Sequence, residues 1–144
     1  MIKRDLYDKI EPNLDSPEAI VITGMRRVGK TTLLQYIHEQ IDSKNKLFLD
    51  LENPLNQGYF EEDDFERIKE TFSSQGVDFD QPVYIFLDEI QLVDNLPQVV
   101  KYLMDHYRVK FFLTGSASFY LKNKFSESLA GRKYIYQLYP FNFD

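Results

Sequence analysis

The stretch Gly24-Met25-Arg26-Arg27-Val28-Gly29-Lys30-Thr31 decides how this chain is expected to fold. It fits the pattern G-x-x-x-x-G-K-[ST], and it lies between an apolar, β-branched run at 19–23 and apolar residues at helical spacing over 33–41. Glycines let such a loop curl so that its backbone N–H groups converge on an anion, and the following helix adds the positive end of its dipole. An ordinary glycine turn is the alternative, but strand, loop and helix together predict a phosphate-binding loop.

Two side chains at the end of this loop suit nucleotide chemistry. Lys30 is expected to carry its charge to the β- and γ-phosphates, and the Thr31 hydroxyl is expected to ligate Mg²⁺. Arg26 and Arg27 sit inside the loop, where most side chains point away from the nucleotide, so we expect them to meet a partner, nearby acids or solvent. The predicted nucleotide-binding residues are Gly24, Arg27, Val28, Gly29, Lys30, Thr31 and Thr32.

A second pair of candidate residues, Asp88 and Glu89, follows the apolar run at 83–87. An apolar strand that ends in an acid is the Walker B arrangement, in which Asp88 would hold Mg²⁺ through its water shell. A carboxylate beside that acid can orient and deprotonate the water that attacks the γ-phosphate, so Glu89 is the predicted catalytic base. The alternative interpretation is that Asp88 and Glu89 are two solvated acids at a strand end. The phosphate-binding loop upstream favours the Walker B interpretation over this one.

Two more positions complete the set of predicted catalytic residues. The run at 109–113 leads into Thr114-Gly115-Ser116, where a polar side chain could sense the γ-phosphate or position the water if this strand lies between the first and third strands. Thr114 and Ser116 both qualify, and a helix N-cap is an equally good explanation. Arg132 could approach the phosphates of its own subunit or of a neighbour as an arginine finger does, although surface arginines are common. The predicted catalytic residues are Lys30, Glu89, Ser116 and Arg132.

Apolar runs alternate with helix-like segments along the whole chain. Strands followed by helices imply parallel pairing and right-handed crossovers, hence an α/β three-layer sandwich on a mainly parallel, five-stranded sheet. The site in such sheets lies beyond the carboxyl ends of the strands, and we expect every motif above at one of those ends. The expected strands are 19–23, 46–49, 83–87, 109–113 and 134–138; the expected helices are 2–10, 33–41, 65–72 and 99–104, with short helical pieces near 119–121 and 128–130.

Composition excludes several other classes of protein. The chain of 144 residues has no cysteine, so disulfide frameworks, thiolate zinc sites and cysteine nucleophiles are excluded. Its net charge of −6 argues against a free-standing nucleic-acid binder. No apolar run approaches the roughly 20 residues of a membrane helix, and the charged start is unlike a signal peptide, so we expect a cytoplasmic protein with no membrane partner. His38 and His106 have no second ligand at metal-site spacing.

These motifs, in this order, resemble those of a large family of prokaryotic AAA-type ATPases. The resemblance implies a P-loop NTPase core of the RecA/AAA-like kind, ATP with Mg²⁺, and a separate C-terminal domain of uncertain role, often with nuclease-like or DNA-binding predictions, into which 138–144 leads. Leu96 is a departure, because relatives often carry a tryptophan after the Walker B strand, and it concerns packing more than catalysis. The resemblance runs from about residue 6 to 144 and rests on 24–34, 87–91, 113–116 and 128–132.

Two functions from different classes fit these observations. The leading hypothesis is a Mg²⁺-dependent ATPase in which the loop residues and Asp88 bind nucleotide and metal and Glu89 is the base. GTP is less favoured because no Asn-Lys-x-Asp motif is present, and a small-molecule kinase is less favoured because no acceptor site is recognisable. The alternative is a nucleotide-dependent binding switch with little hydrolysis. Either way, we expect residues 1–144 to be one ATPase core from a longer chain that drives or regulates its C-terminal domain. A homo-oligomer, and nucleic-acid contact through that missing domain, stay open.

Overall fold

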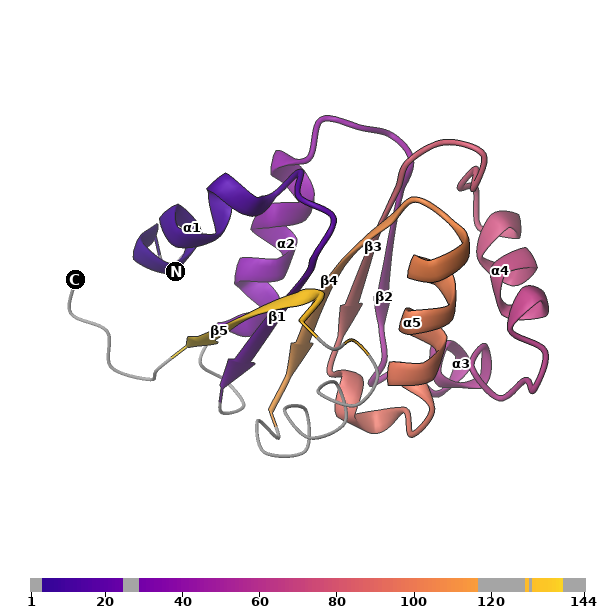
Figure 1. Cartoon of the computed structure of the whole chain (residues 1–144). Helices are drawn as coiled ribbons and strands as arrows, with labels where there is room; N and C mark the ends of the chain where they lie inside the picture. Colours follow the sequence, from indigo (N-terminus) through magenta and orange to yellow (C-terminus); the bar gives the residue numbers. More distant parts are fainter. Residues whose placement is uncertain (1–3, 25–28, 117–128, 130, 139–144) are drawn as a thin grey trace.

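A parallel sheet of five strands forms the centre of the structure, a computed structural model that describes residues 4–24, 29–116, 129 and 131–138. The strand order is β2-β3-β4-β1-β5, and every neighbouring pair is parallel. Parallel neighbours need crossover connections, and Figure 1 shows the helices that supply them. The strands are β1 (Ala19–Gly24), β2 (Lys46–Asp50), β3 (Val83–Asp88), β4 (Val109–Gly115) and β5 (Lys133–Leu138).

Helices cover both faces of this sheet (Figure 1). One face carries α1 (Arg4–Ile10) and α2 (Lys30–Gln40), and the other carries α4 (Phe65–Ser74) and α5 (Leu96–His106). The described ranges also contain three short elements, which are η1 (Glu11–Asn13), α3 (Pro54–Gly58) and η2 (Ile90–Leu92). None of the helices in the described ranges combines the length and the apolar character needed to cross a membrane.

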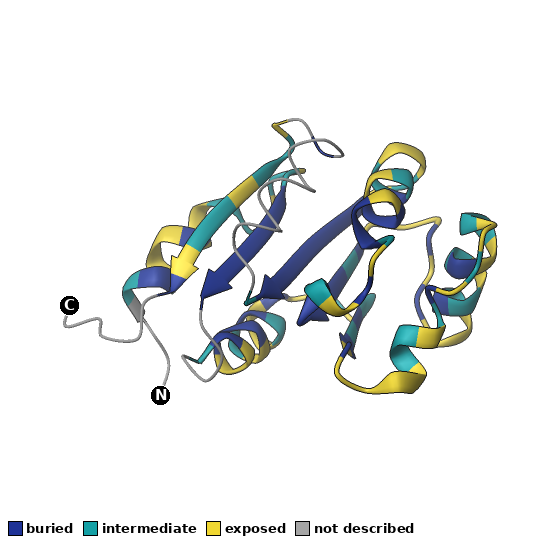
Figure 2. Ribbon diagram, turned by 90° about the horizontal axis from the view of Figure 1, so that it is seen from below, coloured by how far each residue is buried: buried dark blue, intermediate teal, exposed yellow. Residues whose placement is uncertain are grey.

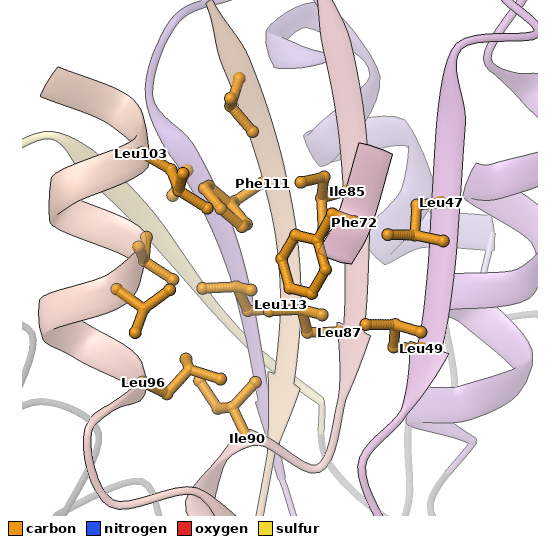
Figure 3. Close-up of a cluster of buried hydrophobic side chains, with 14 of the residues drawn as sticks. Leu47, Leu49, Phe72, Ile85, Leu87, Ile90, Leu96, Leu103, Phe111 and Leu113 are labelled. Carbon is orange, nitrogen blue, oxygen red and sulfur yellow. The ribbon is translucent and has the colours of Figure 1, made fainter. Parts of the chain in front are cut away.

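Alternation along the strands divides the core into two clusters. Val21 and Ile85 face α4 and α5, whereas Ile20 and Phe112 face α2, where they meet Leu33. Figure 3 shows the first cluster, in which side chains from β2, β3 and β4 pack against side chains from the helices. β1 and β4 are buried along their whole length, while the edge strands β2 and β5 are partly exposed (Figure 2). Continuous apolar runs therefore occupy the centre of the sheet, as expected of strands covered on both faces.

The three-layer sandwich expected from the sequence is confirmed, and the sheet is wholly parallel rather than mainly so. The sequence pattern does not predict α3, because Asn53-Pro54 indicates only the end of a strand. In the structure the Asn53 side chain accepts the N–H of Leu55 at 3.0 Å, and Pro54 takes the first helical position. The helical pieces expected near 119–121 and 128–130 lie outside the described residues, apart from Leu129, which is buried in the core.

Candidate nucleotide-binding site

The carboxyl ends of β1, β4 and β3 lie side by side at one edge of the sheet. β4 pairs with β1 on one side and with β3 on the other, which is the position that a phosphate sensor on β4 requires. Thr23 pairs with Gly115, and Leu87 pairs with Leu113. The loop after β1 and the acids at the end of β3 therefore lie at the same edge of the sheet, although they are far apart in the sequence.

Lys30 begins α2 and is buried at this edge, with 3% of its surface exposed. Gly29, just before it, has a φ of 93°, in the left-handed region that glycine adopts without strain. The Nζ of Lys30 donates a hydrogen bond of 2.8 Å to the carbonyl oxygen of Gly24 and lies 3.9 Å from Oε2 of Glu89. The two glycines of the loop thus bracket a buried ammonium group, which faces the predicted base.

Asp88 ends β3 and accepts hydrogen bonds from two hydroxyl groups. The Thr31 hydroxyl donates to Oδ2 at 2.7 Å, and the Thr114 hydroxyl donates to Oδ1. Asp88 is 3% exposed, and this burial raises the pKa of its carboxyl, an effect that the hydrogen bonds from Thr114 and Thr31 oppose. The Thr31–Asp88 contact brings together the two predicted metal ligands.

The donor set at this position fits Mg²⁺. A carboxylate and a hydroxyl are hard oxygen ligands, which Mg²⁺ prefers, and a cation would also favour the charged form of a buried carboxylate. Within the described ranges no group of three His, Asp or Glu side chains could form a metal cage. Mg²⁺ is usually held by one or two protein ligands together with water and substrate phosphates, so Thr31 and Asp88 are a sufficient protein contribution.

Glu89 has a left-handed backbone, with φ 65° and ψ 56°, and is the only non-glycine residue with a positive φ among those described. Such a conformation costs about 1–3 kcal/mol and is often found at functional sites. The N–H of Glu89 donates to the Thr114 hydroxyl at 2.9 Å, and its side chain is buried beside Lys30. The backbone turn thus ends β3 and leaves the carboxylate next to the buried ammonium group.

Gln91 is a site residue that the sequence does not single out. Its Nε2 donates to Oε1 of Glu89 and to the Ser116 hydroxyl, both at 2.8 Å. Its Oε1 accepts the N–H of Ser116 at 3.2 Å. A glutamine two positions after an acid carries no signal by itself, because the contact depends on how β3 and β4 lie next to each other.

The predicted sensor residues Thr114 and Ser116 both reach the site, but through different partners. Thr114 is fully buried and contacts Asp88 and Glu89, whereas Ser116 contacts Gln91. Among the nucleotide-binding residues expected from the sequence, Thr32 is exposed in the first turn of α2, and Arg27 and Val28 lie outside the described residues.

Arg132 lies at the opposite edge of the sheet, so the expectation that every motif falls at a carboxyl end is wrong for this residue. It precedes β5, whose Lys133 pairs with Ala19 at the start of β1, and its carbonyl oxygen accepts the N–H of Ala19 at 3.0 Å. Its Nη1 forms an ion pair of 2.8 Å with Oδ1 of Asp105 on α5. The structure therefore does not bring Arg132 near Lys30 of the same subunit, and an action on a neighbouring subunit stays a prediction.

Thr23, the residue before Gly24, carries a buried hydroxyl group without a hydrogen-bond partner. The residue is 1% exposed. A buried polar group that lacks a partner costs about 1–3 kcal/mol. The sequence gives no sign of this feature, because a threonine is an ordinary residue at the end of an apolar strand.

Solved structures of known proteins share this fold. The chain matches the RuvB Holliday junction branch migration motor of Thermotoga maritima with a TM-score of 0.60 and 15% identity, covering 95% of this chain and 44% of that one. It matches PCH-2 of C. elegans with a TM-score of 0.55 and 16% identity, covering 94% of this chain and 39% of that one. It matches the P-loop NTPase domain of a sigma-54 transport activator from E. coli with a TM-score of 0.55 and 12% identity, covering 96% and 95%. At these identities the likeness shows the fold alone, which is that of the RecA/AAA-like P-loop NTPases, a nucleotide-binding fold.

Sequence comparison identifies the family. An uncharacterized protein of Haemophilus influenzae is 31% identical over 99% of this chain and 36% of its own length. An uncharacterized protein of Methanocaldococcus jannaschii is 31% identical over 99% of this chain and 30% of its own length. The chain thus spans about a third of the length of these relatives. The model of the AAA domain family matches residues 16–144, and the chain belongs to this family.

Proposed function

We propose that this chain is an ATPase domain that binds ATP with Mg²⁺ and hydrolyses it to ADP and inorganic phosphate. The observation that carries the proposal is the position of the Glu89 carboxylate, 3.9 Å from Nζ of Lys30 and next in sequence to Asp88, which Thr31 contacts. A base, a cation for phosphate and a pair of oxygen ligands for a metal therefore meet at the edge where P-loop proteins bind nucleotides.

Each residue has a defined task in this proposal. Lys30 exchanges the Gly24 carbonyl for the oxygens of the β- and γ-phosphates, while Thr31 and Asp88 would hold Mg²⁺. When bound, Mg²⁺ supplies positive charge that neutralises the phosphate oxygens. Glu89 accepts a proton from water as the water oxygen bonds to the γ-phosphorus. The bond between this phosphorus and the bridging oxygen breaks, ADP leaves with the electron pair, and the proton returns to solvent.

A second candidate is a nucleotide-dependent binding switch with little hydrolysis. It is favoured by the contacts that the Glu89 carboxylate already makes, because Lys30 lies beside one oxygen and Gln91 donates to the other. A carboxylate occupied in this way has to change partners before it can orient a water molecule. Under this alternative, nucleotide binding would still rearrange Lys30 and pass a signal to the rest of a longer protein.

The relatives support a further part of the proposal. Because the chain spans about a third of their length, we propose that nucleotide turnover or binding drives or regulates additional domains. The effect of those domains, an assembly of several subunits and an action of Arg132 on a neighbour belong to this part of the proposal. None of them is needed for the chemistry assigned to Lys30 and Glu89.

The experiment compares the wild-type chain and its full-length parent with Lys30→Ala and Glu89→Gln, with release of inorganic phosphate and ATP affinity measured separately. We expect Lys30→Ala to lose ATP binding. We expect Glu89→Gln to bind ATP normally while its turnover falls about 100-fold or more. Glu61→Gln, which changes an exposed acid, is the matched control and should leave both measurements unchanged. If wild type binds ATP but releases phosphate no faster than Glu89→Gln, the switch is the correct function. If Lys30→Ala binds ATP as wild type does, the nucleotide site itself is wrongly assigned.

A further inference from the structure

We propose that Gln91 is a positioning residue that holds the carboxylate of Glu89 and couples it to the end of β4. This inference rests on the proposed ATPase function. Gln91 stands on η2, donates to Glu89 on one side and contacts both the hydroxyl and the N–H of Ser116 on the other. Its side chain connects the carboxylate of the predicted base with Ser116, one of the two predicted sensors of the γ-phosphate.

The hydrogen-bond chemistry fixes the orientation of the Gln91 amide. The N–H of Ser116 can only donate, so it requires the amide oxygen of Gln91. An ionised Glu89 carboxylate can only accept, so it requires the amide nitrogen. Both requirements are met by the same orientation, and the second N–H of the amide reaches the Ser116 hydroxyl. A flipped amide would lose the hydrogen bonds to the Glu89 carboxylate and to the N–H of Ser116.

Buried neighbours and backbone hydrogen bonds fix the backbone around Gln91. Ile90 and Val93, on either side of it, are buried in the core, and Ile90 packs in the cluster of Figure 3. The N–H of Leu92 donates to the carbonyl oxygen of Glu89 at 3.2 Å, and the N–H of Val93 donates to that of Ile90 at 3.2 Å. A side chain on a fixed turn can set the position of a neighbouring group closely, which is what catalysis by a general base needs.

Each carboxylate oxygen of Glu89 therefore has a different partner. Gln91 contacts Oε1, while Nζ of Lys30 lies 3.9 Å from Oε2. When Lys30 moves to the phosphates, Gln91 is the partner that keeps the carboxylate from turning away. Because Gln91 is also bonded to Ser116, a movement of the end of β4 would shift Gln91 and with it the carboxylate of Glu89. The position of the base therefore depends on the strand that lies beside the phosphate site.

The test uses the full-length protein and measures kcat, KM and ATP affinity for Gln91→Ala, Glu89→Gln and the double variant. We expect Gln91→Ala to lower kcat about 10- to 100-fold, while KM and ATP affinity stay within about twofold. Because Gln91 acts through Glu89, the double variant should be no slower than Glu89→Gln alone. Gln57→Ala is the matched control, since Gln57 donates to the carbonyl oxygen of Leu51 and does not touch the site.

A second variant separates positioning from packing. Gln91→Met keeps nearly the length and volume of the side chain but removes the amide that donates to Glu89. A positioning role predicts a kcat about as low as that of Gln91→Ala, whereas a packing role predicts one close to wild type. The inference fails if Gln91→Ala keeps the wild-type kcat, loses ATP affinity instead, or lowers kcat independently of Glu89→Gln. In each of these outcomes the ATPase proposal survives as long as Glu89→Gln alone remains inactive.

Discussion

The hydroxyl of Thr114 donates a hydrogen bond to Oδ1 of Asp88. The same hydroxyl oxygen accepts the N–H of Glu89 at 2.9 Å. One fully buried side chain on β4 therefore fixes both the carboxylate proposed to hold Mg²⁺ and the strained backbone of the proposed base. Both hydrogen bonds lie just beyond Leu87 and Leu113, the last residues at which β3 and β4 pair.

Thr114→Val should therefore destabilise the protein, although valine has nearly the same shape as threonine. The change leaves Oδ1 of Asp88 and the N–H of Glu89 without this partner inside the protein, so we expect a loss of about 2 kcal/mol in the free energy of unfolding. Urea denaturation measures it. ATP turnover should fall at least tenfold. Thr114→Ser retains the hydroxyl and is the control; equal stability of the Val and Ser variants would contradict this account.

The left-handed backbone of Glu89 predicts a difference between two inactive variants. Glycine adopts a φ of 65° freely, whereas alanine pays the same steric cost as glutamate. We expect Glu89→Gly to be about 1 kcal/mol more stable than Glu89→Ala in chemical denaturation, with ATP turnover lost in both. If Glu89→Ala proves the more stable of the two, the backbone of the folded protein does not carry this strain.

Thr23→Val should stabilise the protein, whereas Thr114→Val should destabilise it. The Thr23 hydroxyl is buried without a hydrogen-bond partner, so replacing it with a methyl group removes an unsatisfied polar atom and preserves the shape. We expect the free energy of unfolding to rise by about 1 kcal/mol, measured by urea denaturation. A loss of stability instead would show that the hydroxyl group has a partner in solution.

A cluster away from the site gives the chain a stability that depends on pH. Hydrogen bonds from Tyr102 and Tyr107 lower the pKa of the Glu66 carboxyl from its ordinary value of 4.5. A carboxyl whose pKa is lower in the folded state contributes stability above its unfolded pKa and loses it as the pH falls through its folded pKa. Glu66→Gln should thus destabilise the protein at pH 7, and the difference from wild type should shrink below about pH 4.5. Thermal unfolding at several pH values measures it.

The control for this prediction is Glu70→Gln, which changes an exposed acid on the same helix. Its difference from wild type should be small at every pH. A penalty for Glu66→Gln that stays constant from pH 7 to pH 3 would mean that the tyrosines contact the amide as well as they contact the carboxylate.

The parts of the site that follow from strand direction could be predicted from the sequence. Strand direction predicts that Lys30 and the acids Asp88 and Glu89 lie at one edge of the sheet, and in the structure Nζ of Lys30 lies 3.9 Å from Oε2 of Glu89. The same rule, applied to Arg132, puts it at the amino edge, since it comes before β5 rather than after it. Motif order alone gave the wrong place for this residue in its own subunit.

Other features depend on side-chain geometry that no local pattern encodes. Gln91 matters because a short turn and one rotamer bring its amide to Ser116 on another strand. The backbone strain of Glu89 and the unpartnered hydroxyl of Thr23 arise in the same way, from how β1, β3 and β4 end relative to one another. Such features can be recognised only once the strands have been placed.

The strand order has a consequence for how the chain folds. Within the described residues β1 precedes the other four strands in sequence but pairs with β4 and β5, the last two of these five, so it cannot pair until β4 has been synthesised. Contacts between such distant segments form slowly, because a long loop must close before they contribute. β2, β3 and β4 can assemble earlier through nearer partners. A nucleotide that binds this loop would therefore stabilise the pairing of β1, a step that follows the synthesis of β4.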